Sequence, residues 1–358
     1  MKVLAFPRDP NPYQEQLYAP MREQGAIVNY LTGPTSSHTL NLLCMPLVLL
    51  VKRLSGYDVF HLHWTYTFSL PWAGSTGQRV MQWYFFGLLR LVKLFGYKLV
   101  WTAHNAMPHQ KQFANDLKAR RFLGKKANLV IAHSTSAERQ LLDKRIASYT
   151  VRVVPHGNYT EVYENKMDGQ NARKRLKLPA DAFVALFFGR IDSYKNVPAL
   201  LTAAQKLQAN NPNLYVVIAG SCRDAILQKQ LKNAKRKLGK QLQLHASFIE
   251  EKDVQTYFNA ADICVLPFSE ITTSGSAILS LTFGVPIIAP RKGALKDMPD
   301  KVGFFYDPDV TDGVEIMLQK VMSKKSLLPQ KRAALRYAKQ LAWPTIAGET
   351  KALMENIR

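Results

Sequence analysis

The segment FFGRIDSYKNVPALL, residues 187–201, decides the fold of this chain. It begins as a short apolar strand, turns at Gly189, carries Arg190 and Lys195 on a loop, and continues into an amphipathic helix that opens at Asn196. Open α/β sheets bind their ligands at the carboxyl ends of strands, where this loop is expected. An arginine fork and a lysine charge beside a helix amino terminus suit a diphosphate, and a solvated surface loop is the alternative interpretation.

A second segment has the same order of strand, loop and helix. Residues 261–268 form an apolar strand, residues 272–276 read TTSGS, and residues 277–283 form an apolar helix. The backbone N–H groups of this loop would point at an anion. The alternative is an ordinary helix start capped by Ser274 or Ser276. Two such loops in one half of the chain favour an anion site.

Strands alternate with helices along the whole chain, which predicts parallel sheets covered on both faces. The strands expected in the first half are residues 2–6, 26–31, 59–64, 98–102, 129–134 and 151–155. Those expected in the second half are residues 183–188, 214–219, 242–245, 263–266 and 286–289. The length of 358 residues suits two domains, joined by the polar residues 158–181.

Together these motifs resemble the GT-B glycosyltransferases, most closely the family-4-like enzymes of bacterial polysaccharide and glycolipid synthesis. The resemblance rests on residues 154–157 (VPHG), the two loops described above and residues 219–221 (AGS). It implies two Rossmann-like, doubly wound parallel-sheet domains facing a cleft. An acceptor-binding domain would occupy residues 1–165 and a nucleotide-sugar-binding domain residues 166–340, and a helix at 341–358 would cross back to the first domain.

The resemblance assigns the second domain to a nucleoside-diphosphate sugar. The two cations and the Ser-Gly-Ser loop would hold the diphosphate and stabilise it as the leaving group. The turn near Phe248 and Glu250 would lie beside the base and ribose. No metal or other cofactor is expected, because GT-B enzymes generally work without one. The predicted donor-binding residues are Gly189, Arg190, Lys195, Ser221, Phe248, Glu250, Glu270, Thr273, Ser274, Gly275 and Ser276.

Polar residues in the first half follow predicted strands and are candidate sugar contacts. His63 and Trp64 end one strand, and we expect them to face the cleft while His61 points to the other side, into the core. Asn105 follows another strand, and His156 stands at the domain junction. The predicted acceptor or sugar contacts are therefore His63, Trp64, Asn105 and His156.

The expected stereochemistry follows from a missing acid. Retaining relatives carry two glutamates around the phosphate loop; here Glu270 stands near the first position and Leu279 occupies the second. The chain therefore resembles β-mannosyl-type inverting members, and inversion needs a base from the first domain. Asp9, after the first strand, and His104, which in the resembled family faces the donor sugar, are the candidate catalytic residues. Helix capping is the alternative role for Asp9.

The charge and the apolar helices bear on partners. The formal net charge is +22, and both halves are basic, which suits an anionic membrane or nucleic acid. No nucleic-acid-binding fingerprint accompanies the basic run 229–240, so a membrane surface is expected and nucleic acid is not. The apolar segments 40–54 and 83–95 are too short to span a bilayer. They are interfacial helices of a peripheral enzyme or core helices of the first domain.

The resemblance implies a hexosyltransferase that moves a sugar from a UDP- or GDP-sugar to a lipid-linked saccharide for bacterial surface polysaccharide. Three scattered cysteines and no visible signal peptide predict a cytoplasmic protein, peripheral on the inner face of the cell membrane. The alternative from another class is a basic, nucleic-acid-associated or regulatory α/β binding protein with a degenerate nucleotide cleft. A GT-B epimerase or phosphorylase is the alternative among enzymes.

Overall fold

The computed structural model describes residues 1–70, 74–108 and 110–357, which divide into two compact units. The first unit comprises Met1–Gly157 and Ala342–Arg358, and the second comprises Asn158–Leu341. Within the described residues each unit contains one six-stranded sheet, and every strand pair is parallel. The predicted α/β class with two Rossmann-like domains is confirmed.

The first sheet has the strand order β2-β1-β3-β4-β5-β6. Its strands are β1 (Lys2–Phe6), β2 (Ile27–Tyr30), β3 (Val59–Leu62), β4 (Lys98–Thr102), β5 (Leu129–Ala132) and β6 (Val151–Val153). The helices of this unit are α1 (Tyr13–Glu23), α2 (His38–Leu54), α3 (Gly74–Leu94), α4 (Asp116–Lys126), α5 (Thr135–Asp143) and α13 (Trp343–Glu355). The chain runs from β1 to β2 on one side and returns to β3 on the other, so the strand order reverses between β1 and β3.

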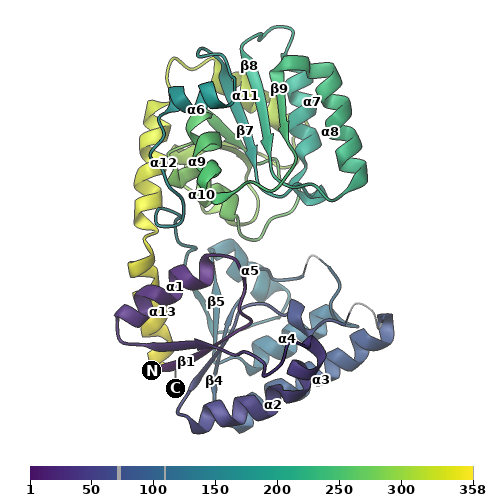
Figure 1. Cartoon of the computed structure of the whole chain (residues 1–358), viewed down its shortest axis with the longest axis vertical. Coiled ribbons are helices and arrows are strands. Elements are labelled where there is room, and N and C mark those ends of the chain that lie inside the picture. Colours follow the sequence, from purple (N-terminus) through teal and green to yellow (C-terminus); the bar gives the residue numbers. More distant parts are fainter. Residues whose placement is uncertain (71–73, 109, 358) are drawn as a thin grey trace. The chain divides into compact units, whose positions relative to one another are not determined.

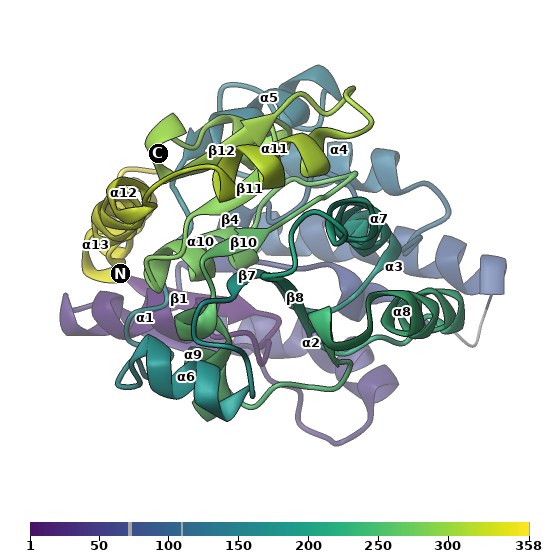
Figure 2. The ribbon, with the colours of Figure 1, turned by 90° about the horizontal axis from the view of Figure 1, so that it is seen from above.

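Two helix layers cover this sheet. The last helix, α13, lies beside α1, as the yellow and purple ribbons of Figures 1 and 2 show. Its Trp343 ring packs 5.3 Å from that of Tyr13, and a methyl group added at Gly157 would lie 2.2 Å from the Trp343 ring. Helices α2, α3 and α4 neighbour one another in turn and cover the core that surrounds Trp101.

The two apolar helices of this layer differ in how far they are buried. Along α3 the buried residues are Gly77, Met81, Gln82, Phe85, Phe86, Leu88, Leu89 and Val92, so one side of the predicted segment 83–95 packs in the core, while Trp83 and Leu94 are exposed. In α2 only Leu42, Met45 and Leu49 are buried. Pro46 lacks the N–H that Leu42 O would accept in a regular helix, and the Tyr84 hydroxyl donates to that carbonyl instead.

The second sheet has the order β12-β11-β10-β7-β8-β9, and Figure 2 shows β12 to β8 side by side in this order. Its strands are β7 (Phe183–Phe188), β8 (Leu214–Ala219), β9 (Leu242–His245), β10 (Ile263–Val265), β11 (Ile287–Pro290) and β12 (Gly303–Tyr306). Its helices are α6 (Gly169–Arg175), α7 (Val197–Leu207), α8 (Ala225–Leu238), α9 (Glu251–Ala260), α10 (Gly275–Thr282), α11 (Gly313–Met322) and α12 (Leu328–Gln340). Here the order reverses between β7 and β10.

Two features of this unit differ from the sequence expectations. Residues 158–181 belong to the second unit and contain α6, so they are not a bare linker. The edge strand β12, whose four residues read GFFY, was not predicted. It pairs with β11, and a methyl group added at Gly303 would lie 2.5 Å from Ile287 O, so a glycine suits this pairing.

Asp262, just before β10, joins α6 to the sheet. Its carboxylate accepts hydrogen bonds from Val184 N at 2.9 Å and from Arg173 Nη2 at 2.8 Å. The Arg173 and Asp262 side chains are only 17% and 21% exposed. Loss of one partner would leave the other charge largely buried and the Val184 N–H without its acceptor.

We predict that Asp262→Ala destabilises the protein by about 3 kcal/mol, because it breaks a largely buried, hydrogen-bonded ion pair. Urea unfolding measures this cost. Glu164→Ala is the matched control, since its pair with Lys166 is exposed on both sides and exposed pairs contribute little. Equal unfolding midpoints for the two variants would contradict the role given to Asp262.

Candidate active site

The reversal of strand order in the second sheet brings the two predicted phosphate loops together. The loop after β7 contacts the loop after β10, since Ser269 N and Ser269 Oγ both donate to Tyr194 O, at 2.8 and 3.0 Å. Strands β7 and β10 are neighbours, so their carboxyl ends open at the same point of the sheet edge. This is the position at which open α/β sheets bind ligands.

Gly189 lies where these loops meet. Its φ of +119° is a value that residues with a side chain rarely adopt. A methyl group added there would lie 3.1 Å from Lys195 Nζ and 3.2 Å from Ser276 Oγ. Gly189, Lys195 and Ser276, all predicted donor-binding residues, therefore lie together. A methyl group on Gly220, at the end of β8, would overlap Gly189 O.

Lys195 is a largely buried cation. Its Nζ lies 6.0 Å from the centre of the Phe187 ring and 5.9 Å from that of Phe268. Burial lowers the pKa of Lys195 to about 8, against the opposing attraction of Asp192. Arg190 is more exposed, and its Nε donates to Asp192 Oδ2 at 2.6 Å. The loop thus carries one buried and one exposed cation.

The start of α10 contains the Ser-Gly-Ser loop. Ser274 is buried, and its Oγ accepts a hydrogen bond from Ala277 N at 3.1 Å, so Ser274 is the helix cap. A methyl group on Gly275 would lie 2.7 Å from the Tyr159 hydroxyl. The first N–H groups of a helix have no partner within it, so this end carries partial positive charge beside Lys195.

The other predicted donor residues lie at the same edge of the second sheet. Ser221 follows β8, and its carbonyl accepts from Ile191 N at 2.8 Å. Phe248 follows β9 and is 79% exposed. Glu250 precedes α9 and pairs with Lys252 at 2.6 Å. Glu270 is exposed and Thr273 half-buried on the loop before α10.

In the first unit, histidines follow four neighbouring strands. His63, His104, His133 and His156 come after β3, β4, β5 and β6. The Tyr13 ring lies against all four, with ring centres 5.8, 4.8, 5.3 and 5.2 Å apart in the same order. We call His63, His104, His133 and His156 the histidine cluster.

A series of hydrogen bonds leads through α1 to His104. His61 Nε2 lies 2.8 Å from Thr102 Oγ1, and the Tyr18 hydroxyl lies 2.7 Å from His61 Nδ1 and 2.6 Å from His63 Nε2. His63 Nδ1 lies 3.3 Å from His104 Nε2. A hydroxyl donates only one hydrogen, so Tyr18 donates to one imidazole and accepts from the other. The tautomers of His61 and His63 are therefore coupled.

The expectation that His61 and His63 point to opposite sides is wrong. Their ring centres are 4.1 Å apart, and both contact Tyr18 of α1. Residues two apart on a strand share a face, so the pair turns toward the same helix. Both side chains are almost fully buried.

Burial keeps the clustered imidazoles neutral. It lowers the pKa of His61 and His133 to about 3 and that of His156 to about 4. It also holds the pKa of His104 well below its ordinary value, with neighbouring histidines adding to the effect. At neutral pH these rings can accept hydrogen bonds. His133 Nε2 has no hydrogen-bond partner among the described residues.

The remaining predicted residues of this unit surround the cluster. The Trp64 ring stacks on His104 at 4.4 Å between ring centres, with 9° between the planes. Asn105 is half-buried beside His104. Asp9 Oδ1 accepts from Asn11 N at 2.8 Å, and its Oδ2 accepts from the Tyr66 hydroxyl at 2.5 Å. Asp9 thus shapes the loop before α1, and Pro12 occupies the cap position of that helix.

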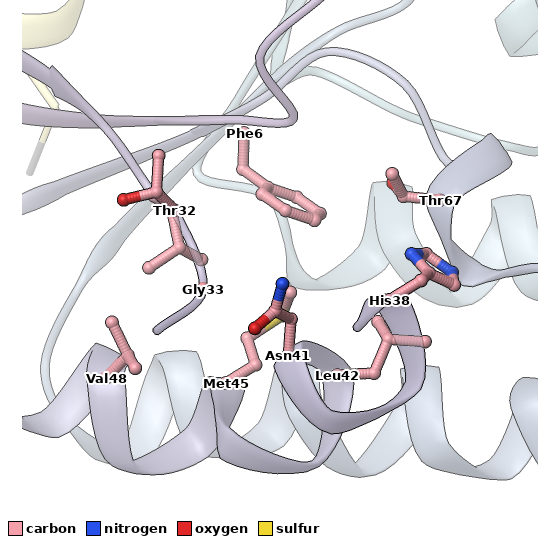
Figure 3. A pocket seen from close by; sticks show the side chains of 10 residues that line it. Phe6, Thr32, Gly33, His38, Asn41, Leu42, Met45, Val48 and Thr67 are labelled. Carbon is pink, nitrogen blue, oxygen red and sulfur yellow. The ribbon is translucent and has the colours of Figure 1, made fainter. Parts of the chain in front are cut away.

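A cavity of about 120 Å³ lies between α2 and the carboxyl ends of β1 and β2 (Figure 3). It is lined by Phe6, Leu31, Thr32, Gly33, His38, Asn41, Leu42, Met45, Val48 and Thr67. Its volume is close to that of the ~150 Å³ apolar cavity that admits benzene. A methyl group on Gly33 would overlap the Asn41 side chain. That side chain forms hydrogen bonds with Thr35 and so holds the loop between β2 and α2 against α2.

Within residues 1–70, 74–108 and 110–357, no group of three or more His, Cys, Asp or Glu side chains could hold a metal ion. None of the helices in that part of the chain is long and apolar enough to cross a membrane.

Sequence reasoning missed His133, Tyr13 and Tyr18. His133 lies near the end of an expected strand, as His63 does, so the repeated position of histidines at strand ends was a usable signal. Tyr13 and Tyr18 had no such signal. They stand five positions apart on a helix, and only the packing of α1 against the sheet brings the Tyr13 ring and the Tyr18 hydroxyl to the histidines.

Comparison with known proteins agrees with this architecture. Residues 1–161 match the family model described as Glycosyltransferase Family 4, and residues 168–340 match the one described as Glycosyl transferases group 1. A GDP-mannose:glycolipid 4-beta-D-mannosyltransferase from Xanthomonas campestris pv. campestris is 26% identical over 259 residues. That match covers 71% of this chain and 68% of the relative.

Solved structures share the whole fold. Sucrose-phosphate synthase from Thermosynechococcus elongatus matches with a TM-score of 0.77 at 17% identity, over 99% of this chain and 98% of that one. Anabaena HepE in complex with UDP and glucose matches with a TM-score of 0.74 at 15% identity, over 99% of both chains. The family matches favour an enzyme over the alternative of a binding protein. The chain is therefore a glycosyltransferase of the GT-B type, with a family 4 first domain and a group 1 second domain.

Proposed function

We propose that this enzyme transfers a hexose from a UDP- or GDP-sugar to a lipid-linked saccharide during bacterial surface polysaccharide synthesis. The reaction proceeds with inversion and without a metal ion, at the inner face of the cell membrane. The similarity to a GDP-mannose:glycolipid mannosyltransferase supports both the donor class and the lipid-linked acceptor. The likeness to a structure that holds UDP and glucose supports a nucleoside-diphosphate sugar.

The observation that carries the proposal is the group formed by Gly189, Lys195 and Ser276 at the strand-order reversal of the second sheet. Gly189 lets the backbone approach a ligand closely, and Lys195 provides a desolvated positive charge. When the bond from the anomeric carbon to the phosphate oxygen breaks, negative charge develops on the diphosphate. Lys195, Arg190 and the N–H groups of α10 stabilise that charge.

The first unit supplies the acceptor side of the reaction. The acceptor hydroxyl forms the new bond to the anomeric carbon and gives its proton to a base. Asp9 and His104 are the candidate bases, and His104 is neutral at physiological pH, as a base must be. The unpartnered His133 Nε2 provides one further acceptor for a substrate hydroxyl. The apolar part of the cavity beside α2, formed by Phe6, Leu42 and Met45 among others, suits a hydrocarbon portion of the acceptor.

Inversion is supported by α10. Leu279, which stands where retaining relatives carry a second glutamate, is buried within that helix. Glu270 lies exposed on the preceding loop. A displacement in which the base lies opposite the leaving phosphate needs no carboxylate at position 279.

A hydrolysis panel of UDP- and GDP-sugars tests the donor class, and we predict turnover with at least one of them. Lys195→Ala and Arg190→Ala should each reduce turnover by about 10²-fold, because a preorganised charge at the leaving group contributes ~3 kcal/mol. Lys229→Ala, on the exposed surface of α8, is the control and should keep wild-type rates. Near-normal activity of both loop variants at saturating donor would remove this loop from the diphosphate site.

Donor binding should weaken as the pH rises above about 8. Burial lowers the pKa of Lys195 to about 8, so its ammonium is present below that pH and lost above it. Calorimetric Kd values for the nucleotide sugar should rise by up to about tenfold per pH unit above 8. Lys195→Arg should give a nearly constant Kd from pH 7 to 9, because a guanidinium stays protonated. A constant Kd for the wild type would speak against a role for Lys195.

The product should have the anomeric configuration opposite to that of the donor. Proton NMR of the new glycosidic bond measures it, and an α-linked product from an α-linked donor would establish retention. Asp9→Asn and His104→Gln separate the two base candidates: loss of the true base should lower kcat by about 10²-fold or more with little change in donor Kd. Glu270→Gln should leave the product configuration unchanged.

A further inference from the structure

Helix α2 has two apolar faces, and only one of them is packed. Leu42, Met45 and Leu49 are buried against the first unit, and Figure 3 shows Leu42, Met45 and Val48 at the cavity on this inner side. The opposite side carries an exposed row that we call the leucine stripe. Its members are Leu40, Leu43, Leu47, Leu50, Val51 and Leu54, which are between 37% and 80% exposed.

The leucine stripe is continuous along the helix. Its leucines are spaced alternately by three and four residues, so at 100° per residue they stand above one another on one side of α2. Scattered exposed leucines are ordinary, but a row of this length leaves a large apolar area in water. A helix that is apolar on all sides is normally covered by protein or lipid.

The charge of the surrounding chain indicates what covers the stripe. Between Gln24 and Asn115 the only acidic residue is Asp58, whose carboxylate accepts from Lys2 N. The same stretch contains Lys52, Arg53, Arg79, Arg90, Lys93, Lys98 and Lys111. An anionic bilayer surface attracts such a region and repels acidic ones, and it accepts apolar side chains below its headgroups.

Two other basic surfaces fit this role less well. On α3, Lys93 Nζ donates to Asn128 Oδ1 at 2.6 Å, and the exposed apolar residues Val80, Trp83 and Leu94 are fewer than those of the leucine stripe. Helix α8 is strongly basic, but Ile226 is its only large apolar side chain that is clearly exposed. Cations alone give weak, salt-sensitive binding.

We propose that the leucine stripe of α2 is the surface on which this enzyme lies in the headgroup region of an anionic membrane. The helix would lie parallel to the bilayer, with its outer leucines inserted and its inner face still packed on the cavity. The inference rests on the proposed function, because the membrane is where the proposed lipid-linked acceptor would reach the enzyme. Its test uses binding alone and does not depend on sugar transfer.

The test is co-sedimentation of the full chain with vesicles of phosphatidylglycerol and phosphatidylcholine in equal parts, and with phosphatidylcholine alone. Leu43→Gln combined with Leu47→Gln removes apolar side chains that are 67% and 65% exposed and changes no charge. The matched controls are Ile226→Gln, an equally exposed aliphatic residue on α8, and Lys229→Gln with Lys232→Gln, which removes two charges there.

We expect the double leucine variant to bind mixed vesicles at least about tenfold more weakly than the wild type, and the α8 variants to stay within about twofold of it. All variants should keep the wild-type melting temperature and its shift with UDP or GDP, which separates loss of the membrane surface from failure of the proposed function. Binding by the double leucine variant equal to that of the wild type would overturn the inference. A second result would also overturn it: the wild type is a dimer, the double leucine variant is a monomer, and both bind vesicles equally. The stripe would then be a contact between two copies of the chain.

Discussion

Parallel strand pairing is the constraint on which the rest of this protein depends. It brings every carboxyl strand end of a sheet to one edge, and the reversal of strand order opens a gap there. In the second unit this gap brings Gly189, Lys195 and Ser276 together from loops far apart in the chain. In the first unit the same constraint gathers histidines that follow four neighbouring strands. The order of the strands, more than the local sequence, therefore brings each set of candidate residues together.

Burial then decides the protonation of these groups. Lys195 lies against aromatic rings with its charge only partly offset by Asp192, and the clustered histidines are too desolvated to be protonated at neutral pH. A desolvated cation interacts strongly with a diphosphate, because little water competes for it. Neutral imidazoles can accept a hydrogen bond from a hydroxyl group. In the proposed reaction the second unit offers a cation to the leaving group, and the first unit offers neutral imidazoles to the acceptor hydroxyl.

Helix α2 connects the fold to the proposed acceptor. Its inner residues complete the core and line the cavity, and its outer leucines have no cover among the described residues of the first unit. Tyr84 and Tyr97 donate hydrogen bonds to α2 carbonyls, at Leu42 and Leu49, and so fix the helix while its outer face stays exposed. Because α2 is firmly held, its exposed apolar side suits a permanent binding surface better than a segment that is exposed only transiently.

Periodicity in the sequence determined the α/β class, the positions of most strands and the glycine-turned loop at residues 187–201. It could do so because strand and helix patterns are local properties of the chain. The roles of the two apolar helices, the shared side of His61 and His63, and the contacts of Tyr18 were decided only by tertiary structure. Segments 40–54 and 83–95 are both apolar on several sides, so composition could not show which side of each helix packs in the core and which side is exposed, as Leu43 of α2 and Trp83 of α3 are. That difference depends on which neighbouring elements cover each helix, and only the folded chain contains this information.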